Sequence, residues 1–292
     1  MRRHRRLARY SGLVPLVPAL LVLIVFFVLP MLELARMSFF EHSRTQVYVP
    51  RATAASYRQF FADPYYGRMV WMSLKVGFFT TAVALICGYP MAYYLTTTRG
   101  WERTLLSGAC LLPVFVTILV GTLGWYIILL PYGLIQELLS LVGLIQGPLA
   151  ALNTFPALVT VMVYLYLPYV VLIVAASIQG VGADKVNAAR VLGATSWGVF
   201  RRVIIPLTVP GITSSAILVF ALSISSYLVP VLITGQRLRV LPMAIFSYTT
   251  DLLNWPFASV LALVLLSIVV IGTYAFTAVM NRLTARGKWD LV

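Results

Sequence analysis

Side chains that could do chemistry are few in this sequence, and they do not form a catalytic set. Its two histidines, His4 and His42, have no serine and aspartate at a plausible common depth beside them. Cys87 and Cys110 lie in apolar segments, away from any metal-ligand spacing. No Gly-x-x-x-x-Gly-Lys-Ser/Thr loop for nucleotide phosphates occurs. We therefore expect no catalytic residue, metal or bound cofactor, and a membrane enzyme is disfavoured because it needs such groups.

One polar segment in the second half has a more informative spacing. Asp184 is a good helix N-cap, and Asn187 stands three residues on, where a capping-box partner belongs. Ala188 and Ala189 are strong helix formers with little bulk, and Gly193 allows a bend or a close approach. The pattern predicts a short capped helix with a small-residue face that docks into a groove. An amphipathic helix lying on the membrane surface is the alternative.

The same segment carries apolar side chains that could contact a partner. Leu192, Trp197, Val199 and Phe200 provide them. Pro206 is expected to end the helix before the next apolar run, because proline lacks a backbone donor.

The composition indicates which kind of secondary structure holds this polar segment in place. The chain is 61% hydrophobic and 10% charged, with a mean hydropathy of +0.93, whereas soluble domains carry about a quarter charged residues. Continuous apolar stretches of bilayer length favour helices over barrel strands, which alternate. We predict an all-α membrane protein with about six transmembrane helices. They span about 12–38, 69–97, 104–131, 154–178, 209–234 and 257–281.

The net charge of +14 is explained by Lys and Arg that collect in the loops of a membrane protein, rather than by a surface that binds nucleic acid. We therefore expect membrane lipid, and no nucleic acid, as a partner. Lys and Arg in alternate loops outnumber those of the other side by about two to one, which predicts that both termini are cytoplasmic. The first apolar run is too long for a signal-peptide core and is read as a retained helix.

The chain is predicted to divide into four parts. These are a cytoplasmic tail at 1–11, a first helix with outer loop at 12–68, a core at 69–281 with a cytoplasmic loop at 180–206, and a cytoplasmic tail at 282–292.

The spacing of the polar segment resembles the signature cytoplasmic loop of ABC importer permeases. That pattern runs Glu-Ala-Ala, three residues, Gly, nine residues, then Ile-x-Leu-Pro. Asn187 stands where the family has its glutamate. The matching positions here are Ala188, Ala189, Gly193 and Pro206, with Val203 and Ile205 as conservative replacements.

Other segments look like the spermidine/putrescine-type branch of these permeases. Gly88 through Tyr93 is similar to its second-helix signature, and Tyr166 through Tyr169 and Leu253 through Phe257 are similar too. Leu112-Pro113 and Thr122 through Trp125 match partly, with Gly121 where a basic residue is often found.

The resemblance implies a type I ABC importer permease fold in the bacterial inner membrane. It implies a small polar solute, a polyamine or similar, passed inward from a soluble binding protein by alternating access. Two copies of an ATPase subunit would hold ATP and Mg, and a second, different permease would complete the pathway. The loop would be the coupling helix that docks on the ATPase. The residues implied in that docking are Asp184, Asn187, Ala188, Ala189, Leu192, Gly193, Ala194 and Trp197.

Polar and aromatic residues within the spans are candidates for the substrate path. Ser225-Ser226-Tyr227 is favoured because it interrupts an apolar span just before Pro230. Helix packing is the alternative role, since small polar residues join membrane helices and aromatics line interfaces. The candidates are Tyr89, Tyr93, Trp125, Ser225, Ser226 and Tyr227, with Tyr164, Tyr166 and Ser223 beside them.

Two other classes of function stay open. An ion-coupled secondary transporter needs ionisable residues within the membrane, and the middles of these spans hold essentially none. No convincing internal repeat supports that class either. A structural scaffold is disfavoured only by the resemblance. A requirement for ATP rather than a proton gradient would discriminate between the two transporters.

Overall fold

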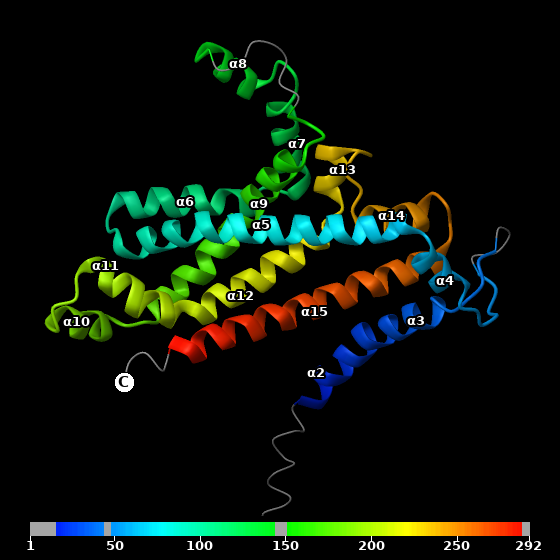
Figure 1. Ribbon diagram of the computed structural model, residues 1–292, viewed down its shortest axis with the longest axis horizontal. Helices are drawn as coiled ribbons and strands as arrows, with labels where there is room; N and C mark the ends of the chain where they lie inside the picture. The colour runs from blue at the N-terminus through cyan, green and yellow to red at the C-terminus, as the bar shows by residue number, and fades with distance from the viewer. Residues whose placement is uncertain (1–15, 44–47, 144–150, 288–292) are drawn as a thin grey trace, which may run out of the picture. The chain divides into compact units, whose positions relative to one another are not determined.

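The computed structural model describes residues 16–43, 48–143 and 151–287 (Figure 1). Within these ranges the regular elements are helices, accompanied by one isolated bridge between Glu41 and Val49. The predicted tail at 1–11 and the start of the first predicted span lie outside the described residues. The chain forms two compact units. One holds the described residues up to Pro64 with Ala244–Val264, and the other holds Tyr65–Met243 with the described residues from Leu265 onward.

The number of spans agrees with the prediction of about six. Five helical runs are long and apolar enough to cross a bilayer, and a sharply bent pair makes the sixth. The five runs are Pro18–Met37, Pro64–Thr97, Phe155–Gln179, Ser196–Ile224 and Trp255–Met280. The bent pair consists of α6 (Trp101–Phe115) and α7 (Ile118–Ile128).

The predicted single helix at 104–131 is therefore wrong, because α6 and α7 meet at an angle of 103°. Val116 and Thr117 adopt extended backbone conformations between them. The Thr117 side chain accepts a hydrogen bond from the Val120 backbone N–H at 3.3 Å, which caps α7. A new N-cap in mid-span explains why the chain turns instead of continuing. The connector that follows holds α8 (Leu134–Leu141).

In the first unit, the run of α2 (Leu16–Leu23), η1 (Ile24–Val28) and α3 (Leu29–Met37) forms the first span. The predicted outer loop after it contains α4 (Ala55–Ala62). Two ion pairs lie in this region: Arg36 with Glu33 at 3.4 Å and Arg51 with Glu41 at 3.9 Å.

Towards the C-terminus, α14 (Leu241–Thr250) was not predicted. α15 (Trp255–Gly287) is longer than the predicted 257–281 and enters the predicted tail. Its start is fixed by Asn254, whose Oδ1 accepts from the Phe257 backbone N–H at 3.1 Å.

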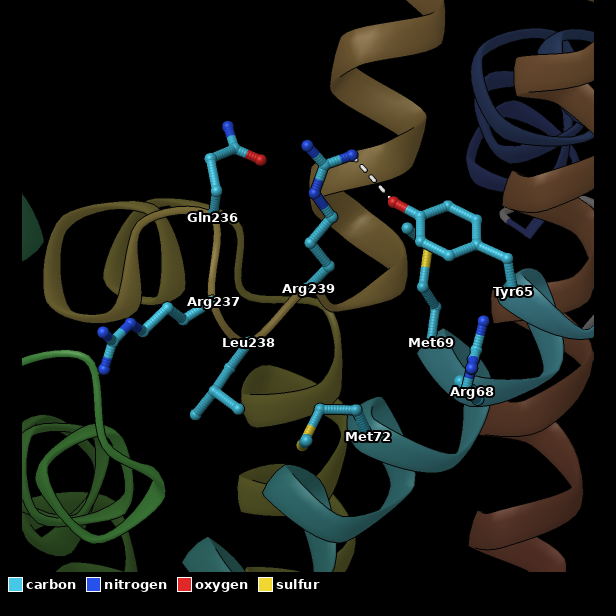
Figure 2. Close-up of a pocket in the computed structure, with 8 residues that line it drawn as sticks. All are labelled: Tyr65, Arg68, Met69, Met72, Gln236, Arg237, Leu238 and Arg239. Carbon is cyan, nitrogen blue, oxygen red and sulfur yellow. Dashed lines mark hydrogen bonds between the residues drawn. The ribbon is translucent and has the colours of Figure 1, made fainter.

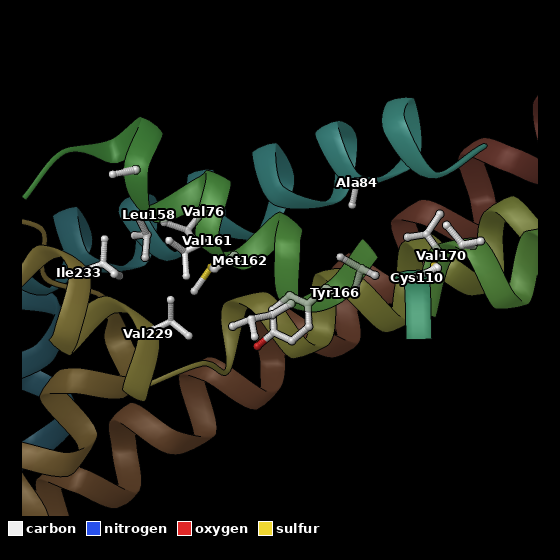
Figure 3. Packing of buried hydrophobic residues seen from close by; sticks show 14 of the residues in the cluster. Val76, Ala84, Cys110, Leu158, Val161, Met162, Tyr166, Val170, Val229 and Ile233 are labelled. Carbon is white, nitrogen blue, oxygen red and sulfur yellow. The ribbon is translucent and has the colours of Figure 1, made fainter. Parts of the chain in front are cut away.

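The core of the second unit forms around α9 (Phe155–Gln179), which packs against α6 and α12 (Ile205–Ile224). Figure 3 shows apolar side chains of α9, among them Leu158, Met162 and Val170, beside Val76 and Ala84 of α5 (Pro64–Thr97). A Cβ on Gly88 of α5 would lie 2.7 Å from the Val170 side chain, so glycine is needed for this approach. Lipid gives little hydrophobic drive between helices, and such close packing is what holds them together.

Two π turns precede two prolines. In η1 the Leu29 N–H bonds the Ile24 carbonyl, and Pro30 follows. In η2 (Phe200–Ile204) the Ile205 N–H bonds the Phe200 carbonyl, and Pro206 follows. A proline ring crowds the carbonyl four residues before it, and widening the preceding turn accommodates that clash. Both helices therefore continue through their proline, including Pro206, which was predicted to end its helix.

Candidate functional site: the polar loop and the helix break

The polar loop begins with α10 (Ala183–Val191), which starts two residues earlier than an N-cap at Asp184 predicts. Gly182, at φ +79°, precedes the helix and offers no side-chain cap. Asp184 is thus the second helical residue, and its predicted N-cap role is wrong. Asn187 lies in the second turn, so the capping-box prediction is wrong as well. The Asp184 carboxylate still lies in the first turn, where the helix dipole favours negative charge.

Gly193 ends α10 through a Schellman motif. Its φ is +83°, its N–H bonds the Arg190 carbonyl at 2.9 Å, and the Ala194 N–H bonds the Ala189 carbonyl at 3.1 Å. A Cβ on Gly193 would meet no atom within 4 Å. The backbone angle, rather than space within this chain, therefore requires glycine here.

Thr195 starts the next helix at once. Its side chain accepts from the Gly198 N–H at 3.2 Å and caps α11 (Ser196–Val199). α11, η2 and α12 then form one run, so the predicted helix end at Pro206 is wrong. The second half of the loop is consequently a helical extension of the fifth span rather than a separate connecting segment.

Three large apolar side chains of the polar loop are exposed. α10 has no buried residue, and the exposed fraction is 87% for Val191, 87% for Leu192 and 67% for Trp197. Ala188 is exposed and Ala189 half-buried. Within the chain, α10 packs on α11 and η2. Large exposed apolar side chains gathered on one short loop are typical of a surface that meets another protein.

An aromatic bridge joins this loop to α5; we use that name for Trp197, Phe200, Tyr89 and Tyr93. Trp197 stacks on Phe200 with ring centroids 5.4 Å apart and planes at 27°. Phe200 meets Tyr93 edge-on at 4.8 Å and Tyr89 at 5.9 Å. Edge-to-face and offset contacts of this kind are worth about 0.5–1.5 kcal/mol each beyond the area they bury.

A hydrogen bond fastens the far side of the bridge to α12. The Tyr89 hydroxyl lies 3.0 Å from Thr208 Oγ1, and Thr208 Oγ1 lies 2.9 Å from the Ile204 carbonyl, to which it donates. Since the threonine has one hydroxyl proton, Tyr89 is the donor to Thr208 when both bonds form. Two tyrosines predicted for the substrate path are thus packed beside the loop.

The predicted fifth span at 209–234 is broken in the middle. α12 ends at Ile224, and α13 (Leu228–Thr234) begins after Ser225, Ser226 and Tyr227. Ser225 is exposed, while Ser226 and Tyr227 are half-buried. Non-helical backbone at membrane depth is tolerated only where protein or an aqueous path surrounds it.

A buried hydroxyl lies beside the break. Ser223 is 2% exposed, and its Oγ has no hydrogen-bond partner among the described residues. On α9, the Tyr166 hydroxyl donates to the Leu222 carbonyl at 3.4 Å. A buried polar atom without a partner costs free energy, so a ligand or water is expected to satisfy it.

The six predicted path residues do not gather in one place. Tyr89 and Tyr93 lie in the aromatic bridge, and Ser225 to Tyr227 lie at the helix break. Trp125 of α7 meets Tyr164 of α9 with centroids 5.6 Å apart, and both pack on the core. Their role in a substrate path stays a prediction.

Sequence reasoning missed two features. Thr208 gave no signal, because its partner Tyr89 lies far away in sequence. Arg68, Arg237 and Arg239 line one pocket. The sequence did contain a sign of this basic site, because Arg237 and Arg239 are separated by a single residue in a loop that has no acidic residue.

Comparison with known proteins adds a family and relatives. Residues 7–285 match the family model described as binding-protein-dependent transport system inner membrane component. The spermidine/putrescine transport system permease protein PotB of Haemophilus influenzae is 30% identical over 263 residues, covering 89% of this chain and 92% of that protein. PotB of Escherichia coli is 29% identical, over 83% of this chain and 88% of that protein. The fold is similar to a chain in the crystal structure of a bacterial ABC transporter that imports alginate, with a TM-score of 0.75 at 17% identity over 97% of this chain and 99% of that one.

Proposed function

Because the chain belongs to the family of binding-protein-dependent transport system inner membrane components, we propose that it passes a polyamine or similar small polar solute inward by alternating access. It is the multi-pass permease subunit of an ATP-driven importer in the inner membrane. Members of this family are membrane subunits rather than enzymes. Relatives named for spermidine and putrescine, matched over most of both chains, support the solute class.

The polar loop is the coupling element of this proposal. A separate ATPase, in two copies that hold ATP and Mg, binds the loop at Asp184 to Trp197 on the cytoplasmic side. The observation that carries this role is the exposure of Val191, Leu192 and Trp197 on a loop that the aromatic bridge anchors to α5. Closure of the two ATPases moves the loop, and the bridge passes that movement to α5 and α12.

A depression in the surface of the loop is the proposed binding site for a side chain of the ATPase. It has a volume of about 610 Å³ and lies between the Schellman turn at Gly193 and the start of the fifth span. Trp197, Arg201 and Arg202 line it, so it combines an aromatic wall with two positive charges. Such a surface fits an apolar side chain flanked by carboxylates.

A second permease, different from this chain, completes the pathway. In this proposal the chain contributes half of the path, and the helix break at Ser225 to Tyr227 faces the solute with Ser223 beside it. Alternating access then opens this break to one side of the membrane at a time.

The test is purification of the tagged chain from its native membrane in mild detergent, with mass spectrometry of the proteins that accompany it, followed by reconstitution. We expect an ATPase, a second permease and spermidine uptake that requires both ATP and the binding protein. A chain that transports alone, driven by a proton gradient without ATP, would overturn the proposal.

A further inference from the structure

A basic pocket lies at the opposite end of α5 from the polar loop. It has a volume of about 500 Å³ and is formed by the first turns of α5 and the loop between α13 and α14 (Figure 2). Arg68, Arg237 and Arg239 line it, with Tyr65, Met69 and Met72. Figure 2 shows Arg239 directed towards Tyr65 and Arg237 directed away from it, so the charges are spread along the rim.

The three arginines have no acidic partner in the part of the chain that the structure describes. Ion pairs do form there at Arg36 and Arg51, but none forms at the pocket. Arg239 Nη1 donates instead to the Tyr65 hydroxyl at 2.7 Å, which fixes its direction. Like charges held together raise the local positive potential, and an anionic group would relieve it.

The length of α5 places this pocket on the external side. At about 1.5 Å per residue, Arg68 and Tyr93 lie about 38 Å apart along the helix, more than the hydrocarbon thickness of about 30 Å. Tyr93 contacts the loop that meets the cytoplasmic ATPase in the proposed function. The pocket therefore opens where solute and binding protein arrive.

We propose that this pocket is a docking site for an acidic surface of the soluble binding protein, whose carboxylates pair with Arg68, Arg237 and Arg239. The inference rests on the proposed function, which supplies that partner. A polyamine is a polycation and would be repelled by the rim, whereas arginine takes carboxylates in two-pronged hydrogen bonds. A protein that holds a polycation needs carboxylates at its cleft, which makes its open face complementary to this rim. Met69 and Met72 add an adaptable apolar floor.

The experiment measures the affinity of the complete reconstituted transporter in nanodiscs for the binding protein that co-purifies with it, at low and high salt. The double variant Arg237→Glu/Arg239→Glu is expected to bind about tenfold more weakly, with less dependence on salt. Tyr65→Phe, which keeps the ring but frees Arg239, should weaken binding about threefold. The double variant Arg51→Glu/Arg58→Glu is the matched control, because it makes the same charge change at two exposed arginines outside the pocket, and its affinity should not change.

The outcomes separate this inference from the proposed function. If wild-type uptake needs the binding protein but the double variant binds it as tightly as wild type, the docking site is wrong and the importer stands. If the double variant lowers only the rate at saturating binding protein, the pocket belongs to the solute path and docking is likewise overturned. If wild-type uptake needs no binding protein, the proposed function itself fails. Should the glutamate variant not assemble, Arg237→Gln/Arg239→Gln carries the same comparison with a smaller expected loss.

Discussion

The ring of Tyr93 packs edge-on against the ring of Phe200, with centroids 4.8 Å apart and planes at 68°. Tyr93 lies near the end of α5, and Phe200 is the first residue of the π turn at the end of the polar loop. This one contact joins the element proposed to meet the ATPase to a second transmembrane helix. Movement of the loop therefore has a direct route into the membrane.

Replacing Phe200 with alanine should uncouple ATP hydrolysis from transport. The variant loses ring contacts to Trp197, Tyr89 and Tyr93, each worth about 0.5–1.5 kcal/mol. We expect solute uptake per ATP hydrolysed to fall about tenfold, measured in proteoliposomes with a phosphate-release assay. Phe200→Tyr keeps a ring and should behave as wild type. If solute uptake per ATP hydrolysed is the same for Phe200→Ala and Phe200→Tyr, the aromatic bridge has no role in coupling.

Gly193 should tolerate asparagine but not valine. At φ +83° a β-branched residue is strained by about 1–2 kcal/mol, whereas asparagine enters this region readily. Because a Cβ meets nothing within 4 Å, the two variants test the backbone angle rather than bulk within this chain. ATPase co-purification and uptake should drop several-fold in Gly193→Val and little in Gly193→Asn. Similar losses in both would point to steric exclusion by the partner instead.

Ser223→Ala should change the transport of solute without harming the fold. Its hydroxyl is buried without a partner in the described structure, so its removal is neutral or slightly stabilising. If the solute meets this hydroxyl at the helix break, the KM for uptake should rise several-fold. Ser215→Ala is the control, since the Ser215 hydroxyl is also buried but donates to the Ile212 carbonyl. An unchanged KM in Ser223→Ala would leave the break with a purely structural role.

Gly88→Ala should destabilise the membrane domain, whereas Gly67→Ala on the same helix should not. A Cβ at Gly88 would lie 2.7 Å from Val170, and at Gly67 it would meet nothing within 4 Å. Overpacking costs about 1–3 kcal/mol, while alanine in an open helical site gains about 0.5–1 kcal/mol. Thermal unfolding of the purified complex should therefore move in opposite directions. A melting temperature unaffected by Gly88→Ala would mean that α5 and α9 can separate locally at little cost.

The sequence predicted features that depend on local chemistry. α9 begins and ends within a residue of its predicted bounds because Thr154 caps a long apolar run. The positions of Ala189 and Gly193 also have structural meaning, since Ala189 accepts one Schellman bond, from the Ala194 N–H, and Gly193 donates the other, to the Arg190 carbonyl. The prediction failed where the sequence held two competing local signals. Asp184 was predicted as the N-cap of α10, but Gly182 occupies that position. Pro206 was predicted to end a helix, but the π turn before it lets the helix continue.

Features that depend on distant partners could not be predicted. The contact of Tyr89 with Thr208, and the gathering of Arg68 with Arg237 and Arg239, join residues far apart in sequence. The bend at Val116 has a local cause in the Thr117 cap, but the contacts of α7 with α9 and α13 join segments that are distant in sequence.

The π turn at Phe200–Ile204 also sets the rotational phase between the loop and the fifth span. One residue more than an α-turn turns everything that follows by about 100° around the helix axis. Deleting a single residue there would shorten the chain by less than 1%, yet it would swing Thr208 to another side of the helix while Trp197 and the loop stayed where they were. Among relatives of this chain, insertions and deletions should therefore accumulate in the connector near α8 and be rare between Thr195 and Thr208.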